Sequence, residues 1–200
     1  MMKKIIALFL TLGLLTACAS NDAPPAPQDM SFKDQAPIAL AVSDFQIVQD
    51  YKSPMAAPNV EHMFAISPAK AVESWVKDRL SAKGGQFLAR VVIRDASVKE
   101  TELPYTKGWR GWFSTEEAAR YDGSLSVMIE IVRPDGYVEA YVSAKSTQSR
   151  TVLENASQSD KDRVWYDLTR ALANDIDREL SKQISANFGP ILMTRGPATM

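Results

Sequence analysis

A long amphipathic repeat near the C-terminus is the feature that most constrains the fold of this chain. From about Ser157 to Asn187, apolar residues recur at helical spacing and form one stripe. Polar residues, most of them charged, occupy much of the remaining surface, which is typical of a helix with one buried face. The chain must therefore supply an apolar surface for this helix to cover. The stripe consists of Trp165, Leu168, Leu172, Ile176, Leu180 and Ile184.

Four segments with strand-like patterns supply that surface. Pro37–Ile47 contains a continuous apolar run, which favours a strand covered on both faces. Phe87–Ala96 alternates, with one face wetter than the other, and a weaker extension runs toward Leu103. Tyr121–Val132 and Tyr137–Thr147 also alternate, and the Pro-Asp-Gly sequence between them is a strong turn signal. These last two segments are expected to pair as an antiparallel hairpin.

Two further helical segments are expected. Ser67-Pro68 suits a helix start, because Ser can cap free amides and Pro fits the first helical position. The pair Gly84-Gly85 is expected to end this helix in a left-handed turn. Ser114–Glu117 resembles a capping box and predicts one short helical turn that reaches about Arg120.

The order strand, helix, three strands, helix predicts an α+β fold. We expect a two-layer sandwich in which two amphipathic helices lie on one face of a mixed sheet of about four strands. The first two strands can be parallel across the first helix. The predicted folded domain spans residues 37–189, between a disordered tether over residues 18–36 and a loose tail over residues 190–200.

The N-terminus has the three parts of an export signal. Lys3 and Lys4 precede the apolar run Ile5–Leu15, which is short for a membrane-spanning helix. The run ends in Leu15-Thr16-Ala17-Cys18, which resembles the lipobox of bacterial lipoproteins. Residues 1–17 are therefore expected to be a signal peptide. Cys18 is the only cysteine in the sequence, and lipidation would account for an otherwise unpaired cysteine.

The lipobox resemblance implies a lipid anchor. It implies transfer of a diacylglyceryl group to the Cys18 sulfur, cleavage before Cys18 and acylation of the new amine. Three acyl chains would hold the chain firmly on a membrane. In the sorting rule of this family, Asp after the cysteine retains the protein in the inner membrane. Ala19 therefore implies the periplasmic face of the outer membrane.

Composition excludes several classes of function. Loss of residues 1–17 leaves 21 Lys and Arg against 24 Asp and Glu, a net charge of about −3, which is unlike a nucleic-acid-binding domain. No pattern for a metal, phosphate loop or other cofactor is present. His62 is the only histidine, and we expect it to be a loop or edge residue and not a catalytic one. No catalytic set can be named, so an enzyme is not expected.

A cluster of aromatic residues stands out in the segment between residues 104 and 113. Trp and Tyr are favoured at interfaces, and Gly residues separate the aromatics here. One hypothesis is a binding surface for a partner protein, lipid or glycan. The alternative is a lid that folds back over the open sheet face. The candidate residues are Tyr105, Trp109, Trp112 and Phe113.

Acidic residues on the long helix are interpreted as a solvated face. Basic residues are interleaved with them, so local ion pairs explain the pattern. The acidic residues are Asp160, Asp162, Asp167, Asp175 and Asp177.

The preferred functional hypothesis is a non-enzymatic accessory or binding subunit of an envelope transport or assembly system, with an unidentified envelope protein as its partner. The element order resembles that of auxiliary lipoproteins of envelope ABC-type transport systems. The Ala41–Phe45 sequence is also similar to the first strand of small lipoproteins of secretion and cell-wall synthesis. Neither resemblance carries a residue role to this chain.

Two alternatives remain open from the sequence. A lipid or glycan carrier would need a cavity lined by Phe87, Val91, Leu125 or Trp112. A carboxylate-only envelope hydrolase would need a deep pocket that holds Glu100 or Glu102 beside an aromatic wall.

Overall fold

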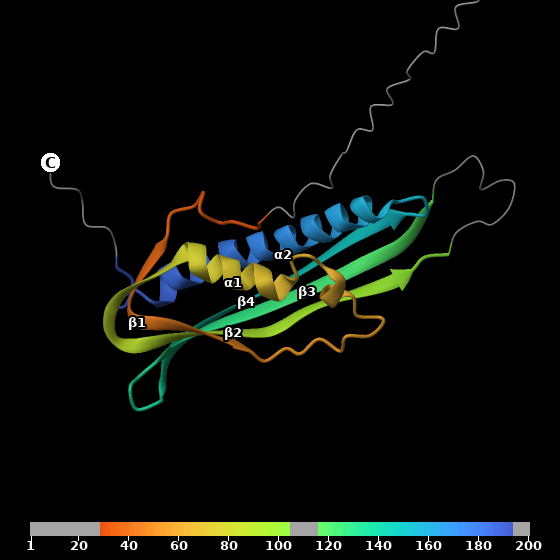
Figure 1. The fold of residues 1–200 in the computed structure, drawn as a ribbon. Helices are drawn as coiled ribbons and strands as arrows, with labels where there is room; N and C mark the ends of the chain where they lie inside the picture. Colours follow the sequence, from red (N-terminus) through yellow and green to blue (C-terminus); the bar gives the residue numbers. More distant parts are fainter. Residues whose placement is uncertain (1–28, 105–115, 194–200) are drawn as a thin grey trace, which may run out of the picture.

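The computed structural model describes residues 29–104 and 116–193. They form an α+β sandwich of a four-stranded sheet and two helices, as the sequence predicted (Figure 1). The elements are β1 (Ile38–Gln49), the short 3-10 helix η1 (Glu61–Met63), α1 (Pro68–Arg79), β2 (Leu80–Glu102), β3 (Glu117–Val132), β4 (Val138–Leu153) and α2 (Gln158–Asn187).

The sheet has the strand order β1-β2-β3-β4. β1 and β2 are parallel across α1, and β2, β3 and β4 are antiparallel neighbours. The parallel first pair and the β3–β4 hairpin are both confirmed. Gly136 allows the hairpin turn, since its φ of 90° is in the region that favours glycine, and its amide donates to the Arg133 carbonyl.

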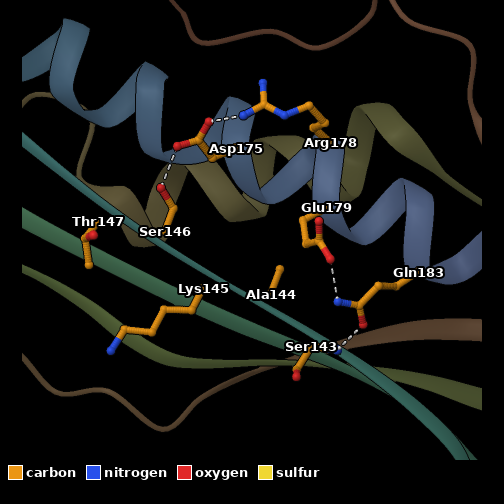
Figure 2. Close-up of a pocket in the computed structure, with 9 residues that line it drawn as sticks. All are labelled: Ser143, Ala144, Lys145, Ser146, Thr147, Asp175, Arg178, Glu179 and Gln183. Atoms are coloured by element: carbon orange, nitrogen blue, oxygen red, sulfur yellow. Dashed lines mark hydrogen bonds and ion pairs between the residues drawn. The ribbon is translucent and has the colours of Figure 1, made fainter.

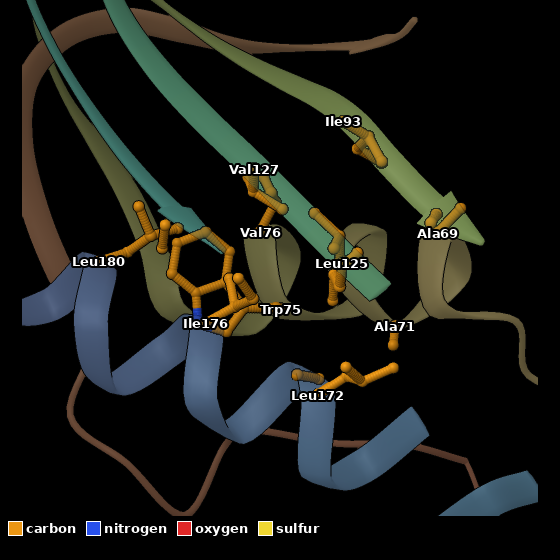
Figure 3. Close-up of a cluster of buried hydrophobic side chains, with 14 of the residues drawn as sticks. Ala69, Ala71, Trp75, Val76, Ile93, Leu125, Val127, Leu172, Ile176 and Leu180 are labelled. Carbon is orange, nitrogen blue, oxygen red and sulfur yellow. The ribbon is translucent and has the colours of Figure 1, made fainter. Parts of the chain in front are cut away.

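Both helices cover the same face of the sheet (Figure 1). α2 lies over β3 and β4, while α1 packs beside it against β1 and β2. The predicted α2 stripe is buried, and so are the inward-facing residues of β3. Figure 3 shows Trp75 of α1 among Ile176 and Leu180 of α2. Each such fully buried large side chain contributes about 2 kcal/mol of hydrophobic stabilisation.

The N-termini of both helices are fixed by serine caps. The Ser67 hydroxyl accepts from the Lys70 amide, and Pro68 occupies the first helical position. Ser157 and Asp160 form a reciprocal capping box at the start of α2. These caps satisfy amides that a helix start otherwise leaves unpaired.

The expected helix end at Gly84-Gly85 is wrong. α1 ends at Arg79 and the chain enters β2 at once, so both glycines lie inside a strand. β2 carries extra residues there, because Leu40 and Val42 of β1 pair with Ala82 and Phe87. A glycine pair favours positive φ angles both at the end of a helix and in a β-bulge. Here Gly84 and Gly85 adopt positive φ angles within a bulge of β2.

The helical turn predicted to reach Arg120 is also wrong over its described part. Residues 117–120 form the start of β3, and Ala119 pairs with Val152. Ser114 lies outside the described residues. Pairing with β4 outweighs the local capping signal, because the ladder along the rest of β3 supplies many backbone hydrogen bonds.

The folded domain extends beyond its predicted limits at both ends. Met30 and Phe32, within the predicted tether, are buried in the core. Asp78 accepts from the Phe32 amide and the Ser31 hydroxyl, both at 3.0 Å. In the predicted tail, the Ile191 carbonyl accepts from the Ala41 amide at the outer edge of β1.

Candidate functional site

A polar groove of about 500 Å³ runs between β4 and α2. Consecutive residues of β4 form its floor, and side chains one and two turns apart on α2 form its wall (Figure 2). The groove follows β4 because β4 is the last strand of the sheet and α2 lies above it. Its lining residues are Ser143, Ala144, Lys145, Ser146, Thr147, Asp175, Arg178, Glu179 and Gln183.

The free edge of β4 presents backbone groups to this groove. Along an antiparallel strand, successive residues direct their N–H and C=O groups alternately to the two sides. The Glu154 amide donates to Glu116 beside β3, so even-numbered residues bond inward. From Tyr141 onward, past the register shift at the start of β4, odd-numbered residues therefore direct their N–H and C=O groups outward.

Two side chains bond to this outward edge. The Ser143 amide donates to Oε1 of Gln183 at 3.3 Å, and Gln183 is oriented by a 2.8 Å hydrogen bond to Glu179 (Figure 2). At the other end, Nη1 of Arg150 donates to the Ser149 carbonyl at 2.8 Å. The outward N–H and C=O groups of Lys145 and Thr147 lie between these two bonds.

Charges in the groove are partly neutralised by one another. Burial would raise the pKa of Asp175, but hydrogen bonds from Ser146, Gln148 and Arg178 outweigh burial and hold that pKa below its ordinary value. Arg178 remains exposed. Lys145 is exposed on the opposite face of the sheet, and no ion pair to it is found within residues 29–104 and 116–193.

A second polar groove of about 560 Å³ lies over β2, β3 and β4. Its lining includes hydroxyl side chains on three neighbouring strands, with Ser97 opposite Ser124 and Ser124 opposite Thr147. Lys99 and Asp122 form the next row. Such a surface offers hydrogen bonds to a polar ligand.

The aromatic candidates and the lipidation candidate lie outside the described residues. Tyr105, Trp109, Trp112 and Phe113 belong to the segment between β2 and β3, and Cys18 precedes residue 29. Their proposed roles therefore stay predictions from the sequence.

Among the described residues, no hydrogen bond or ion pair joins His62 to Glu100 or Glu102. His62 is exposed on η1. Glu100 accepts a hydrogen bond from the Tyr121 hydroxyl at 3.1 Å, whereas Glu102 is exposed at the end of β2. Burial, followed by the nearby Glu100 charge, raises the pKa of Tyr121 to about 12, which suits a hydrogen-bond donor. Across the described ranges, no cluster of side chains could hold a metal ion.

The carrier hypothesis lacks its interior cavity at the described positions. Val91 and Leu125 are fully buried and belong to the continuous core. Phe87 packs against this core, so side chains fill the space between sheet and helices.

The interpretation of Asp177 as a solvated residue is wrong. Its side chain is buried, and Oδ1 pairs with Nε of Arg79 at 2.8 Å. Asp177 is four residues after buried Ala173 and three before buried Leu180, so the helical spacing already placed it on the inner face. Asp175, by contrast, is partly exposed in the groove.

A second buried carboxylate, Glu61, has no sequence signal that we identified. Its oxygens accept from the hydroxyls of Tyr51 and Ser53, from the Asn59 amide and from the Val98 backbone amide. Burial would raise the pKa of Glu61, but these hydrogen bonds lower it below the ordinary value. The network holds the β1–α1 connection against β2.

No family model matches the chain, and no curated protein matches it. Among the described residues, no helix is long and apolar enough to cross a membrane.

Several solved structures resemble the fold at low sequence identity. Rare lipoprotein B from Shewanella oneidensis is 9% identical, with a TM-score of 0.37 over 72% of this chain and 96% of that chain. A minor lipoprotein from Acinetobacter baumannii is 12% identical, with a TM-score of 0.40 over 78% and 99%. A putative lipoprotein from Caulobacter crescentus is 10% identical, with a TM-score of 0.38 over 71% and 88%. At these values the likeness assigns neither a family nor a function to this chain.

Proposed function

We propose that this chain is a lipid-anchored protein of the bacterial envelope, and that its domain binds another envelope component without catalysing a reaction. The observation that carries the proposal is Leu15-Thr16-Ala17-Cys18 directly after a short apolar run, with Cys18 the only cysteine. The folded domain supplies a surface for the second part of the proposal, the polar groove between β4 and α2.

The proposed location is the periplasmic face of the outer membrane, in an envelope transport or assembly system. Ala19 supports this membrane through the sorting rule that retains Asp-bearing lipoproteins in the inner membrane. The pathway rests on the resemblance in element order alone.

Acyl labelling tests the anchor. Cells that express the full chain are fed an alkyne fatty acid, and the label is read on the purified protein. Labelling is expected in the wild type and absent in Cys18→Ser. The matched control restores a thiol two residues later, as Cys18→Ser with Ser20→Cys, and is also expected to stay unlabelled. A label that persists in Cys18→Ser contradicts the proposal.

Membrane sorting is tested by one substitution. Ala19→Asp is expected to move the protein from the outer-membrane to the inner-membrane fraction of a density gradient. Ala19→Ser is the control and is expected to stay in the outer membrane. An unchanged distribution for Ala19→Asp contradicts the proposed location.

Site-specific crosslinking tests the binding role and separates its two candidate surfaces. A photoreactive residue is placed at Trp109 or Trp112 in the aromatic segment, or at Arg178 in the groove. One envelope protein captured repeatedly from a single surface supports an accessory role. The absence of any captured protein at all three positions counts against it.

A further inference from the structure

We propose that the free edge of β4 binds a single extended peptide segment of a partner protein as a fifth strand, with a carboxylate of that segment beside Lys145. This inference rests on the proposed binding role and names its ligand class. Recognition of this type uses backbone hydrogen bonds for affinity and side-chain positions for specificity.

Unused backbone groups define where the segment would bind. Gln183 occupies the Ser143 amide, and Arg150 occupies the Ser149 carbonyl. Between them, the outward N–H and C=O groups of Lys145 and Thr147 have no backbone or side-chain partner in the described part of the chain. An incoming strand would pair with these groups in the ladder geometry already present between β3 and β4.

The position of α2 favours one strand over a second copy of the domain. Gln183 projects from α2 far enough to reach the outward amide of Ser143, so the α2 wall extends over the free edge (Figure 2). Paired strands lie about 4.8 Å apart, but packed helices need about 8–10 Å between their axes. An antiparallel pair of β4 edges would bring two α2 helices close together on one face of the joined sheet, whereas a bare peptide brings no helix.

The charge of Lys145 at the free edge favours an acidic segment. Lys145 is exposed and points from the strand on the face opposite α2. Opposite charges directly across a strand pair stabilise the pairing. The groove carboxylates, Asp175 and Glu179, belong to α2 on the other face of the sheet. Asp175 is already held by Ser146, Gln148 and Arg178, and Glu179 accepts from Gln183. An incoming carboxylate beside Lys145 would therefore meet a cation that has no ion pair within the described residues.

The edge also resists indiscriminate pairing. Exposed strand edges invite aggregation, and a lysine at the edge is a common protection against it. Two copies of the Lys145–Thr147 segment would bring like charges together, while an acidic strand would neutralise the charge. The same side chain thus disfavours self-association and favours the proposed ligand.

Peptide selection against the full mature protein in detergent tests this inference. The probe is a displayed library of random peptides of about seven residues, a common strand length. Selected peptides are expected to contain an acidic residue within an alternating pattern. Their affinity is then measured by fluorescence anisotropy of the labelled synthetic peptides.

Three variants separate edge pairing from other binding. Thr147→Pro removes an outward N–H without removing a ladder bond to β3, and it is expected to weaken binding roughly tenfold or more. Thr151→Pro removes an outward N–H on the same edge beyond Arg150, together with the exposed hydrogen bond from Thr151 to Glu117, and is expected to leave binding nearly unchanged. Lys145→Glu is expected to reject acidic peptides and to bind versions in which Lys replaces the acidic residue.

Several results would overturn the inference. They are recovery of no peptide, equal affinity for wild type and Thr147→Pro, or no charge preference at Lys145. A dimer in solution that Thr147→Pro dissociates would show that the occupant is a second copy. Thermal unfolding of each variant shows whether it folds. If Thr147→Pro does not fold, the charge preference of Lys145→Glu, a substitution at an exposed position, still decides the test. Failure here leaves Cys18 labelling unaffected, so it is distinguishable from failure of the anchor proposal.

Discussion

Arg79 and Asp177 form a buried ion pair that joins α1 to α2, with 2.8 Å between Nε and Oδ1. Their side chains are only 7% and 5% exposed. The same Asp177 oxygen accepts from the Trp75 indole N–H at 2.6 Å. One carboxylate therefore fixes two donors on the neighbouring helix, and these three residues set how α1 lies against α2.

Removal of this carboxylate is expected to be costly. Asp177→Ala leaves the Arg79 charge buried without its partner and is expected to lower the free energy of unfolding by about 3–5 kcal/mol. Asp167→Ala, at an exposed position on the same helix, is expected to change it by less than about 0.5 kcal/mol. Urea unfolding measures both. Similar values for the two variants would show that the pair does not hold the helices together.

The two glycines in the β2 bulge are expected to differ in their tolerance of alanine. A Cβ at Gly85 would lie 2.5 Å from the Ala41 carbonyl oxygen, while a Cβ at Gly84 would meet nothing within 4 Å. Both have positive φ, so Gly84→Ala carries conformational strain alone, about 1–2 kcal/mol. Gly85→Ala is expected to destabilise by clearly more, because β1 must also shift. Equal midpoints in thermal unfolding would contradict this.

Glu61 is expected to stabilise the fold only while it is ionised. Its pKa in the folded protein lies below the ordinary 4.5, so its contribution is complete above pH 4.5 and is lost as pH falls through the folded value. Glu61→Gln is expected to cost about 1.5–3 kcal/mol at pH 7, the range for hydrogen bonds to a charged group. Chemical unfolding at several pH values gives the wild-type minus variant difference. That difference should shrink below pH 4.5, and a constant difference would refute the assignment.

Gln183 is expected to protect one backbone amide at the edge of β4. Gln183→Ala removes the acceptor of the Ser143 amide and is expected to accelerate hydrogen exchange there severalfold, as suits a bond worth about 1 kcal/mol. Gln148→Ala is the control, since Gln148 bonds to Asp175 and to no backbone group at this edge. If Ser143 exchanges equally in both variants, its protection has another source.

Much of the architecture could be predicted, because the spacing of apolar residues along the sequence indicates which side chains face the core. The stripe from Trp165 to Ile184 and the alternation in β3 each reflect one side facing the core, and both were read correctly. Local signals were less reliable. Gly84-Gly85 and the capping-box sequence after Ser114 describe what a short segment favours, whereas pairing of distant strands decided the structure of residues 80–102 and 117–120.

The candidate groove could not be predicted, because its parts are separated in sequence and depend on tertiary placement. Lys145 and Thr147 lie at a free edge because β4 is the last strand of the sheet. No local sequence pattern indicates the order of the strands. The Glu61 network likewise joins a loop to Val98 of β2. Asp177 is different. Its spacing along α2 predicts a position on the buried face, whereas its charge favours a solvated one, and the structure follows the spacing.

Phe32 is buried in the domain and its amide bonds to Asp78, so only a short stretch of chain separates Cys18 from the folded domain. From Cys18 to Asp29 the chain has about 11 residues, with a fully extended length of about 40 Å. A lipid on Cys18 would confine the domain to a layer of roughly that depth. A partner segment that reaches the groove must enter the same layer, so encounter becomes a search along the membrane surface, with a raised effective concentration of both components.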